Sequence, residues 1–303
     1  MNYKKLIKSK NLRLKLLKFL DFLPDRLMIK IQYKISTGRK LDLKHPMRFT
    51  EKIQWYKLNF RDQLMVQCSD KYAVRKYVES KGLRDILVPI LGVYNISTDI
   101  DFEELPSSFV LKTTNGSHTN ILCKNKEDLN IDYTIQKLNR WISAWDGKMG
   151  REWAYHNIIP KIICEKYLEN DRDGDLIDYK FFCFKGEPFY LYVITERFFD
   201  GGFIYATLTK LGIFDLEFNQ LPYKRVDIPK LLKKVEKPEN FNRMIDIARK
   251  LSKDFPHVRV DLYNVDGQIF FGELTFYNGS GYKGYEPDEF DFIVGEKFEL
   301  PKL

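Results

Sequence analysis

The stretch HVRVDLYNVDGQIFFGELTFYNGSG, from His257 to Gly281, contains two strand-like runs on either side of the turn NVDGQ, which predicts a β-hairpin. Each run carries one carboxylate among apolar neighbours: Asp261 in VRVDLY and Glu273 in FFGELTF. Burying an unpaired carboxylate is costly, so such a group normally ionises beside a cation, a metal or several hydrogen-bond donors. The hairpin therefore predicts a site built around these two acids.

Antiparallel pairing of the two strands would bring Asp261 and Glu273 together, where they repel each other unless a cation joins them. Mg²⁺ prefers oxygen ligands and commonly binds one or two carboxylates together with nucleotide phosphates. Arg259 lies two positions before Asp261 and therefore shares its face of the strand. We interpret the acids as metal ligands and Arg259 as a cation suited to a phosphate or a developing oxyanion.

The composition indicates a globular protein of two or three packed subdomains, with 303 residues, 44% of them hydrophobic and 15% aromatic. Helical patterns occupy residues 1–60 and 131–160, and antiparallel strands dominate the C-terminal two-thirds, so the predicted fold class is α+β. Four cysteines are scattered without C-x-x-C spacing. We interpret them as reduced, buried thiols of a cytosolic protein, not as disulfides or a zinc site.

The positive charge is concentrated at the N-terminus. Residues 1–57 contain sixteen Lys/Arg and four Asp/Glu, a balance of +12, so a total of +8 leaves −4 for the remainder. No apolar stretch approaches the ~20 residues that span a bilayer, and the lysine-interrupted start lacks the core of a signal peptide. Three interpretations of this basic segment remain open: a solvated helical face, a surface that contacts an anionic membrane, and a surface that contacts an anionic polymer. No zinc finger, RNA-binding strand motif or basic zipper supports nucleic acid as the partner.

A small-residue loop is a candidate for phosphate binding. Lys112 stands at the end of a predicted strand, directly before Asn115-Gly116-Ser117. Backbone N–H groups in such a loop can hold a phosphate that the lysine neutralises. The motif is neither a P-loop nor a dinucleotide-binding fingerprint, so an ordinary exposed turn is the alternative.

Two other predicted strands carry charged residues. Glu165 lies in ICEKYLE, and Asp178 and Lys180 share one face of DYKFFCF. Taken alone, they are equally compatible with solvent-facing strand residues and a weak ion pair.

In chain order, SDKYAVRKYV, FVLKTTNGS, ICEKYLE, DYKFFCF and the C-terminal hairpin together resemble the ATP-grasp superfamily. The strings EKIQW, DKYAVR, REWAY, DYKFFCF, RVDLY and FGELTF narrow the resemblance to the teichuronopeptide-biosynthesis (TupA-type) branch, found among bacterial surface-polysaccharide genes. The resemblance covers about residues 20–285 and implies two α+β lobes that hold ATP between largely antiparallel sheets. We therefore expect a basic helical N-terminal segment at 1–66, an N-lobe with the phosphate-cover loop at 67–168 and a C-lobe with the metal site at 169–303.

The resemblance also implies roles for individual residues. Lys71 and Lys112 match the lysines that contact the ATP phosphates, and Asn115, Gly116 and Ser117 belong to the matching cover loop, which extends to Thr119. Glu165, Tyr167 and Leu168 match the hinge that meets adenine, and Asp178 matches the contact with the ribose. Those matched to catalysis are the metal carboxylates Asp261 and Glu273 and the cation Arg259, and Lys180 and Arg197 are predicted as further catalytic cations. Many members have Asn two positions after the second metal carboxylate, where this chain has Thr275, so Thr275, Asn278 or a water completes the shell. Arg151 and Arg197 are predicted substrate contacts from their charge and position.

The implied reaction transfers a phosphoryl group from ATP to a carboxylate, with Mg²⁺ bound, and an amine then displaces phosphate to form an amide. The branch resemblance points to a uronic acid of a capsular or teichuronic-type glycan, which can be lipid-linked, and to an amino acid or an amine. The alternatives are a glycosyltransferase of polysaccharide biosynthesis, a sugar kinase on the same scaffold and a non-catalytic binding protein. The glycosyltransferase alternative lacks a D-x-D string within a parallel βαβ pattern. We expect a cytoplasmic location, with peripheral contact at the inner face of the membrane.

Overall fold

The structure is a computed structural model that describes residues 19–20, 22–116, 119–143, 150–168, 176–195, 198–200, 203–205 and 209–302. The α-helices are α3 (Asp25–Thr37), α4 (Phe49–Asn59), α5 (Gln63–Ser69), α6 (Val74–Ser80), α7 (Ile131–Ser143), α8 (Trp153–His156), α9 (Phe241–Ser252) and α10 (Glu289–Lys297). The 3₁₀ helices are η1 (Arg84–Ile86), η2 (Ser97–Asp99), η3 (Lys126–Asp128) and η4 (Asn278–Gly281).

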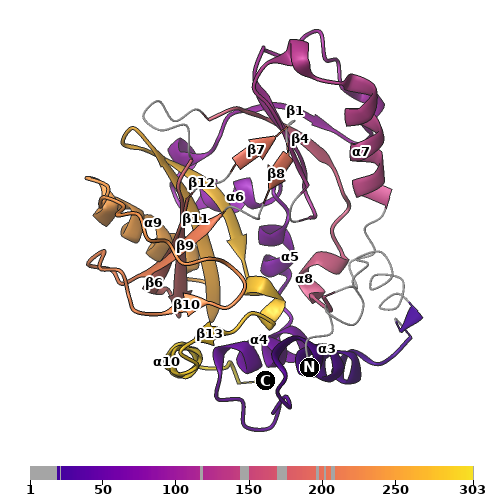
Figure 1. The fold of residues 1–303 in the computed structure, drawn as a ribbon. Helices are drawn as coiled ribbons and strands as arrows, with labels where there is room; N and C mark the ends of the chain where they lie inside the picture. Colours follow the sequence, from indigo (N-terminus) through magenta and orange to yellow (C-terminus); the bar gives the residue numbers. More distant parts are fainter. Residues whose placement is uncertain are drawn as a thin grey trace.

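The strands are β1 (Ile90–Tyr94), β2 (Phe109–Thr113), β3 (Asn120–Cys123), β4 (Ile162–Lys166), β5 (Asp178–Phe184), β6 (Glu187–Thr195), β7 (Phe198–Asp200), β8 (Phe203–Tyr205), β9 (Lys210–Phe214), β10 (Lys224–Arg225), β11 (His257–Val265), β12 (Gln268–Thr275) and β13 (Tyr285–Glu286). They form a four-stranded sheet in the order β1-β4-β2-β3, a five-stranded sheet in the order β12-β11-β5-β6-β9, and the pairs β10-β13 and β7-β8. All the pairings between these strands are antiparallel, so the predicted α+β class with antiparallel sheets is confirmed. Figure 1 shows the small sheet and α7 at one end of the molecule, and α3, α4 and α10 at the other.

The five-stranded sheet is covered on both faces, which explains the nearly continuous apolar run of its central strand. On one face, the Phe181 ring of β5 packs against Phe241 of α9, with 5.7 Å between the ring centroids. On the other face, the adjacent Phe182 packs against Phe49 of α4 at 6.1 Å. Because successive side chains of a strand point to opposite faces, both must be apolar where both faces are buried.

The C-terminal hairpin forms as the sequence predicts. Strands β11 and β12 are joined at Asp266 and Gly267, whose φ angles of 48° and 85° suit the tight turn that an Asp-Gly pair favours. The register shifts after Asp261, so Gly272 is an extra residue on β12. A Cβ added at Gly272 would lie 3.1 Å from the Asp261 carbonyl oxygen, so glycine allows the two strands to approach closely beside the acids.

One predicted helix begins later than expected. The pattern at residues 68–82 predicts a helix that starts at Ser69 or Asp70 and stops at Gly82, but Ser69 is the last residue of α5, and α6 runs only from Val74 to Ser80. The Asp70 carboxylate accepts hydrogen bonds from the backbone N–H groups of Tyr72 (2.7 Å) and Ala73 (2.8 Å), which favours a turn over a continuous helix. Lys71 is therefore presented from a turn.

The four-stranded sheet has its own core, in which Leu138 of α7 packs with Phe109, Leu111 and Cys164 of the strands. Helices α4, α5 and α6 instead share the core of the larger sheet. The predicted boundaries at residues 66 and 168 remain a proposal. All four cysteines, Cys68, Cys123, Cys164 and Cys183, are free and buried, as expected. Within the part of the chain that the structure describes, no helix has the length and apolarity to cross a bilayer.

A buried carboxyl joins the N-terminal and C-terminal helices and makes stability depend on pH. Asp291 of α10 is fully buried and accepts hydrogen bonds from the N–H (3.0 Å) and hydroxyl (2.7 Å) of Thr50 on α4. Burial raises the pKa of Asp291 from 3.8 to about 6. The folded state therefore favours the protonated form, and this stabilisation is present below pH ~4 and lost as pH rises through ~6.

We predict that the native protein loses stability relative to the Asp291→Asn variant as pH rises. The difference between their free energies of unfolding, native minus variant, should fall by up to about 3 kcal/mol between pH 4 and pH 7. Denaturant titrations of both proteins at several pH values measure the difference. The asparagine variant cannot titrate at this position and serves as the reference. A difference that stays constant with pH would contradict the raised pKa.

Candidate active site

Arg259 brings the two acids of the hairpin together. Asp261 on β11 stands directly opposite Glu273 on β12. The Arg259 guanidinium donates to both Asp261 carboxylate oxygens, from Nε at 2.6 Å and from Nη2 at 2.7 Å, and Nη2 also donates to Glu273 Oε1 at 2.9 Å. Partial burial by itself would raise the pKa of Glu273, but the cations Arg259, Lys180 and Lys71 outweigh it and lower that pKa to about 2.

Thr275 and Asn278 belong to the same cluster. Arg259 Nη2 donates to the Thr275 hydroxyl at 2.9 Å, and Nη1 donates to Asn278 Oδ1 at 2.7 Å. The Thr275 hydroxyl in turn donates to Glu273 Oε1 at 2.9 Å. Each residue that the sequence nominates as a metal ligand therefore has an oxygen within hydrogen-bond distance of this one guanidinium.

A second cation is supplied by β5, which pairs with β11 on the side away from β12. Lys180 is the register partner of Asp261, and its ammonium group forms an ion pair with the Asp261 carboxylate. The same ammonium lies 2.7 Å from Asp178 Oδ2. Asp178 and Asp261 are almost completely buried, so Lys180 compensates both charges, and the pair is more than a weak surface contact.

The small sheet presents a lysine–glutamate pair. Lys112 on β2 and Glu165 on β4 lie diagonally across the two strands, with Lys112 Nζ 2.5 Å from Glu165 Oε2. Burial would lower the pKa of Lys112, but Glu165 reverses the effect and raises it. Tyr167 and Leu168 directly follow β4 and are partly exposed.

Lys71 lies against the predicted phosphate loop. Its ammonium group donates to the carbonyl oxygens of Thr113, at 3.2 Å, and Gly116, and its backbone N–H donates to the Thr114 carbonyl at 3.1 Å. Asn115 is 1% exposed, and neither its amide oxygen nor its amide nitrogen has a hydrogen-bond partner. A buried amide without partners is costly, which is consistent with a position that awaits a polar ligand.

Glu273 of the hairpin interacts electrostatically with two lysines outside its own sheet. Glu273 raises the pKa of Lys112 on β2, and Glu273 and Lys71, in the turn before α6, each influence the pKa of the other. Sequence reasoning therefore nominated residues from separate sheets that the fold brings to one region. Ser117 and Arg197 lie outside the described residues. Arg151 is 6% exposed and donates to Asp25 of α3 at 3.1 Å, so its contacts described here are with the N-terminal helix.

The donor set suits magnesium that is shared with phosphates. Across the residues that the structure describes, no three His, Cys, Asp or Glu side chains are grouped as metal ligands. Mg²⁺ needs only one or two carboxylates when nucleotide phosphates and waters supply the other oxygens. Asp261 and Glu273, with a hydroxyl and an amide oxygen beside them, meet that requirement.

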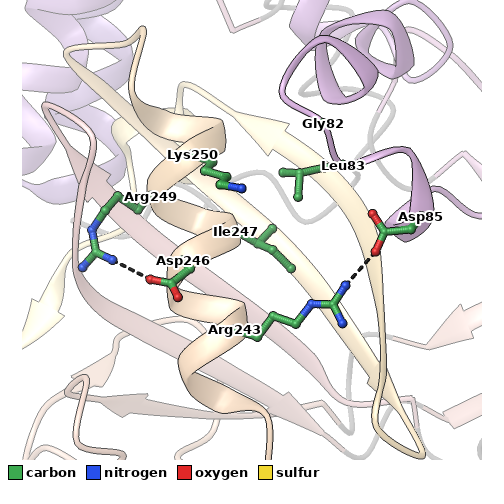
Figure 2. A pocket seen from close by; sticks show the side chains of 8 residues that line it. All are labelled: Gly82, Leu83, Asp85, Arg243, Asp246, Ile247, Arg249 and Lys250. Atoms are coloured by element: carbon green, nitrogen blue, oxygen red, sulfur yellow. Dashed lines mark hydrogen bonds and ion pairs between the residues drawn. The ribbon is translucent and has the colours of Figure 1, made fainter.

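A separate surface pocket of about 470 Å³ lies between α9 and the segment Gly82–Asp85, and Figure 2 shows the side chains that line it. Its charged groups pair with one another, Arg243 with Asp85 at 2.6 Å and Arg249 with Asp246 at 2.8 Å. None of the predicted site residues lines this pocket. We therefore locate the candidate active site at the acid cluster and not here.

Sequence reasoning assigned no role to several groups beside the cluster, among them Lys57, Glu152, Tyr155 and Ser280. The only signal was that Lys57 directly follows EKIQWY and that Glu152 and Tyr155 lie in REWAY. The strings EKIQW and REWAY carried the family resemblance without a chemical interpretation.

The overall fold has counterparts among solved structures. The fold is similar to that of an L-amino acid ligase from Bacillus licheniformis, with a TM-score of 0.52, 11% identity, and coverage of 93% of this chain and 64% of that one. A D-alanine–D-alanine ligase from Bacillus anthracis has a TM-score of 0.43 at 16% identity, with coverage of 69% of this chain and 56% of that one, too low a similarity to carry an argument. The chain thus spans less than two-thirds of these proteins.

Comparison with curated protein sequences gave no match. Residues 51–299, most of the chain, match the family described as TupA-like ATPgrasp. The antiparallel sheets and the solved ligase fold are consistent with that match. The chain belongs to the TupA-like ATP-grasp family.

Proposed function

We propose that this protein is an ATP- and Mg²⁺-dependent carboxylate–amine ligase that joins a uronic acid of a bacterial surface glycan to an amino acid or amine. The observation that carries the proposal is the opposition of Lys71 and Lys112 to Glu273, Asp261 and Arg259 across two sheets. Cations on one side and metal-binding acids on the other suit a triphosphate with its magnesium ion. The glycan context comes from the family resemblance.

In this proposal, ATP lies between the two sheets. Lys71 and Lys112 bind its phosphates, Asn115 and Gly116 belong to the loop that covers them, and Glu165, Tyr167 and Leu168 form the adenine hinge. Asp178 contacts the ribose. Asp261 and Glu273 hold magnesium, with Thr275 or Asn278 as a further oxygen ligand. Bound magnesium would neutralise the phosphate oxygens and orient the tail of the nucleotide.

The chemistry has two steps. A carboxylate oxygen of the acceptor attacks the γ-phosphorus, and ADP leaves, which forms an acylphosphate. Arg259 stabilises the negative charge on the transferring phosphoryl group, with Lys180 as a neighbouring cation. The amine then attacks the carbonyl carbon, and phosphate leaves with the C–O bonding electrons. Exclusion of water protects the acylphosphate from hydrolysis.

A panel of reactions tests this function. Glucuronic and galacturonic acids, free and as short oligomers, are combined with amino acids and amino alcohols, and ADP release is measured with mass detection of products. We expect amine-dependent ADP release and a product one amide bond larger. Phosphorylated sugar formed without any amine would indicate the kinase alternative, and transfer from a nucleotide sugar would indicate the glycosyltransferase.

Glu273→Gln should reduce turnover by at least about 100-fold, because the neutral amide no longer binds magnesium as a carboxylate does. Glu236→Gln, at an exposed position, is the matched control and should retain native activity. Initial rates of ADP release at saturating Mg²⁺ measure both. Near-native turnover of the Glu273 variant, with an unchanged melting temperature, would remove the metal assignment.

Lys112→Met combined with Glu165→Gln removes a charged pair without leaving either charge buried and unpaired. We expect the double variant to fold and to bind ATP about 10- to 100-fold more weakly, since a hydrogen bond to a charged group contributes about 1.5–3 kcal/mol. Calorimetric titration with a non-hydrolysable ATP analogue and Mg²⁺ measures the affinity. Lys124→Met, at an exposed position just beyond β3, is the control. Equal ATP affinities of the double variant and this control would mean that the assignment of the loop to phosphate binding is wrong.

We also propose peripheral contact with an anionic membrane through residues 1–57, where the charge balance is +12. Phe19 and Phe22, each 75% exposed, lie within this basic sequence and could enter the headgroup region. Deleting residues 1–18 should lower binding to phosphatidylglycerol vesicles and leave ATP affinity unchanged. Flotation with phosphatidylcholine vesicles and at high salt provides the controls. Equal flotation of truncated and full-length protein on anionic vesicles would disprove the membrane contact.

A further inference from the structure

A lysine is buried beside the acid cluster at the end of α4. Lys57 is 1% exposed, and its ammonium group donates to the Gly150 carbonyl at 2.9 Å and to the Ser280 hydroxyl oxygen at 3.0 Å. The same group lies over the Tyr282 ring, 4.4 Å from its centroid. Burial lowers the pKa of Lys57 to about 7. A buried cation is costly to maintain, so its partners matter to the site that it supports.

Ser280 connects this lysine to a carboxylate. The Ser280 hydroxyl oxygen accepts from Lys57. Burial raises the pKa of Glu152, and Lys57 and the Ser280 side chain each oppose that rise. The chain approaches closely here, because a Cβ added at Gly150 would lie 3.0 Å from Ser280 Oγ and 3.2 Å from Glu152 Cδ. The result is an ordered series of ammonium, hydroxyl and carboxylate groups.

This series borders the proposed catalytic centre. Ser280 follows Asn278 by two residues within η4, and Asn278 Oδ1 accepts from Arg259 at 2.7 Å. Tyr155 interacts electrostatically with Glu152 and also with Glu273 and Arg259, which indicates that Glu152 lies in the region of the groups assigned to phosphoryl transfer. Glu152 is partly exposed, whereas Lys57 is buried.

The surroundings of Glu152 suit a cation. Glu152 interacts electrostatically with Lys57 of α4, with Tyr155 of its own segment and with Tyr277 and Tyr282 at the end of the hairpin, and Ser280 also acts on it. A partly exposed carboxylate binds an ammonium group by charge. Arg151 is already paired with Asp25.

We propose that Glu152, positioned by Lys57 through Ser280, binds the ammonium group of the incoming amine and accepts its proton. This inference rests on the proposed ligase function. It also gives the strings EKIQW and REWAY a shared chemical role, because the helix that contains EKIQW carries Lys57 and REWAY contains Glu152. Lys57 is a positioning residue because it acts on the amine only through Ser280 and Glu152.

The step balances in atoms and charge. The ammonium group loses one proton to the Glu152 carboxylate, which frees the nitrogen lone pair. That pair forms the C–N bond to the acyl carbon, and the C–O bond to phosphate breaks with its electrons on the phosphate. The second nitrogen proton leaves with phosphate as the amide forms, and Glu152 returns its proton to solvent.

Hydroxylamine separates this step from acylphosphate formation, because it is largely unprotonated at neutral pH and traps an acylphosphate as a hydroxamate without a general base. We expect Glu152→Gln to lower the ratio of amide to hydroxamate by about 100-fold or more, the lower range for general base catalysis. The reaction contains ATP, Mg²⁺, the uronic acid panel and either hydroxylamine or the amine panel. Glu236→Gln is the matched control and should keep the native ratio.

Lys57→Met and Lys57→Arg test the positioning role. Lys57 lowers the pKa of Glu152, opposing the larger effect of burial, so Lys57→Met should move the acidic limb of the amide-formation profile to higher pH. Lys57→Arg should restore it towards the native pH. A profile that does not move in Lys57→Met, with an unchanged melting temperature, would contradict positioning by charge.

The outcomes distinguish the two proposals. No hydroxamate from the native protein with any of the uronic acids would overturn the proposed function. Hydroxamate from the native protein with an unchanged amide-to-hydroxamate ratio in Glu152→Gln would overturn the role of Glu152 alone. Equal loss of both products in a folded Glu152→Gln variant would also overturn it, because the residue would then serve the first step.

Discussion

The contact between Arg259 and the two acids of the C-terminal hairpin is the interaction on which the site depends. Asp261 and Glu273 are direct register partners, so their charges would repel across the strand pair without a cation between them. Arg259 supplies that cation from the same face of β11, and the extra residue Gly272 allows the strands to approach at this point. The pairing of β11 with β5 then adds Lys180 on the other side of Asp261.

The same principle governs the small sheet. Lys112 has Glu165 as its partner, and Lys71 donates to backbone carbonyls of the adjoining loop. Phosphates that reach these two lysines would therefore replace protein acceptors, and the loop between β2 and β3 would have to adjust. Such exchange allows a highly charged ligand to enter without leaving either lysine buried and unpaired before it arrives.

The N-terminal helices do more than carry positive charge. Helix α4 contributes Phe49, Ile53 and Tyr56 to the core of the larger sheet and contacts α10 through Thr50 and Asp291. Its last turn extends Lys57 towards the turn that follows β12. A segment that reads as a basic helical addition is thus part of the wall beside the candidate active site, which explains why the family match begins within it, at residue 51.

Local pattern was sufficient for much of the fold and for the centre of the site. Two-residue alternation and the Asp-Gly turn predicted the hairpin, and pairing across it placed Arg259, Asp261 and Glu273 together. The helix predicted to start at Ser69 or Asp70 begins only at Val74, because the Asp70 side chain accepts hydrogen bonds from Tyr72 and Ala73 and so favours a turn there. The roles of the ATP-binding residues came from the resemblance and remain proposals.

The sequence by itself determined which residues share a strand face and which strands are neighbours through a short turn, because these relations depend on backbone geometry over a few residues. Only the tertiary structure decided that Lys57, Glu152 and Ser280 meet, and that Lys71 and Lys112 face Glu273. Those groups are separated by up to 223 residues of chain, and their proximity follows from how helices and sheets pack. Packing of that kind is set by the whole core, and no local periodicity encodes it.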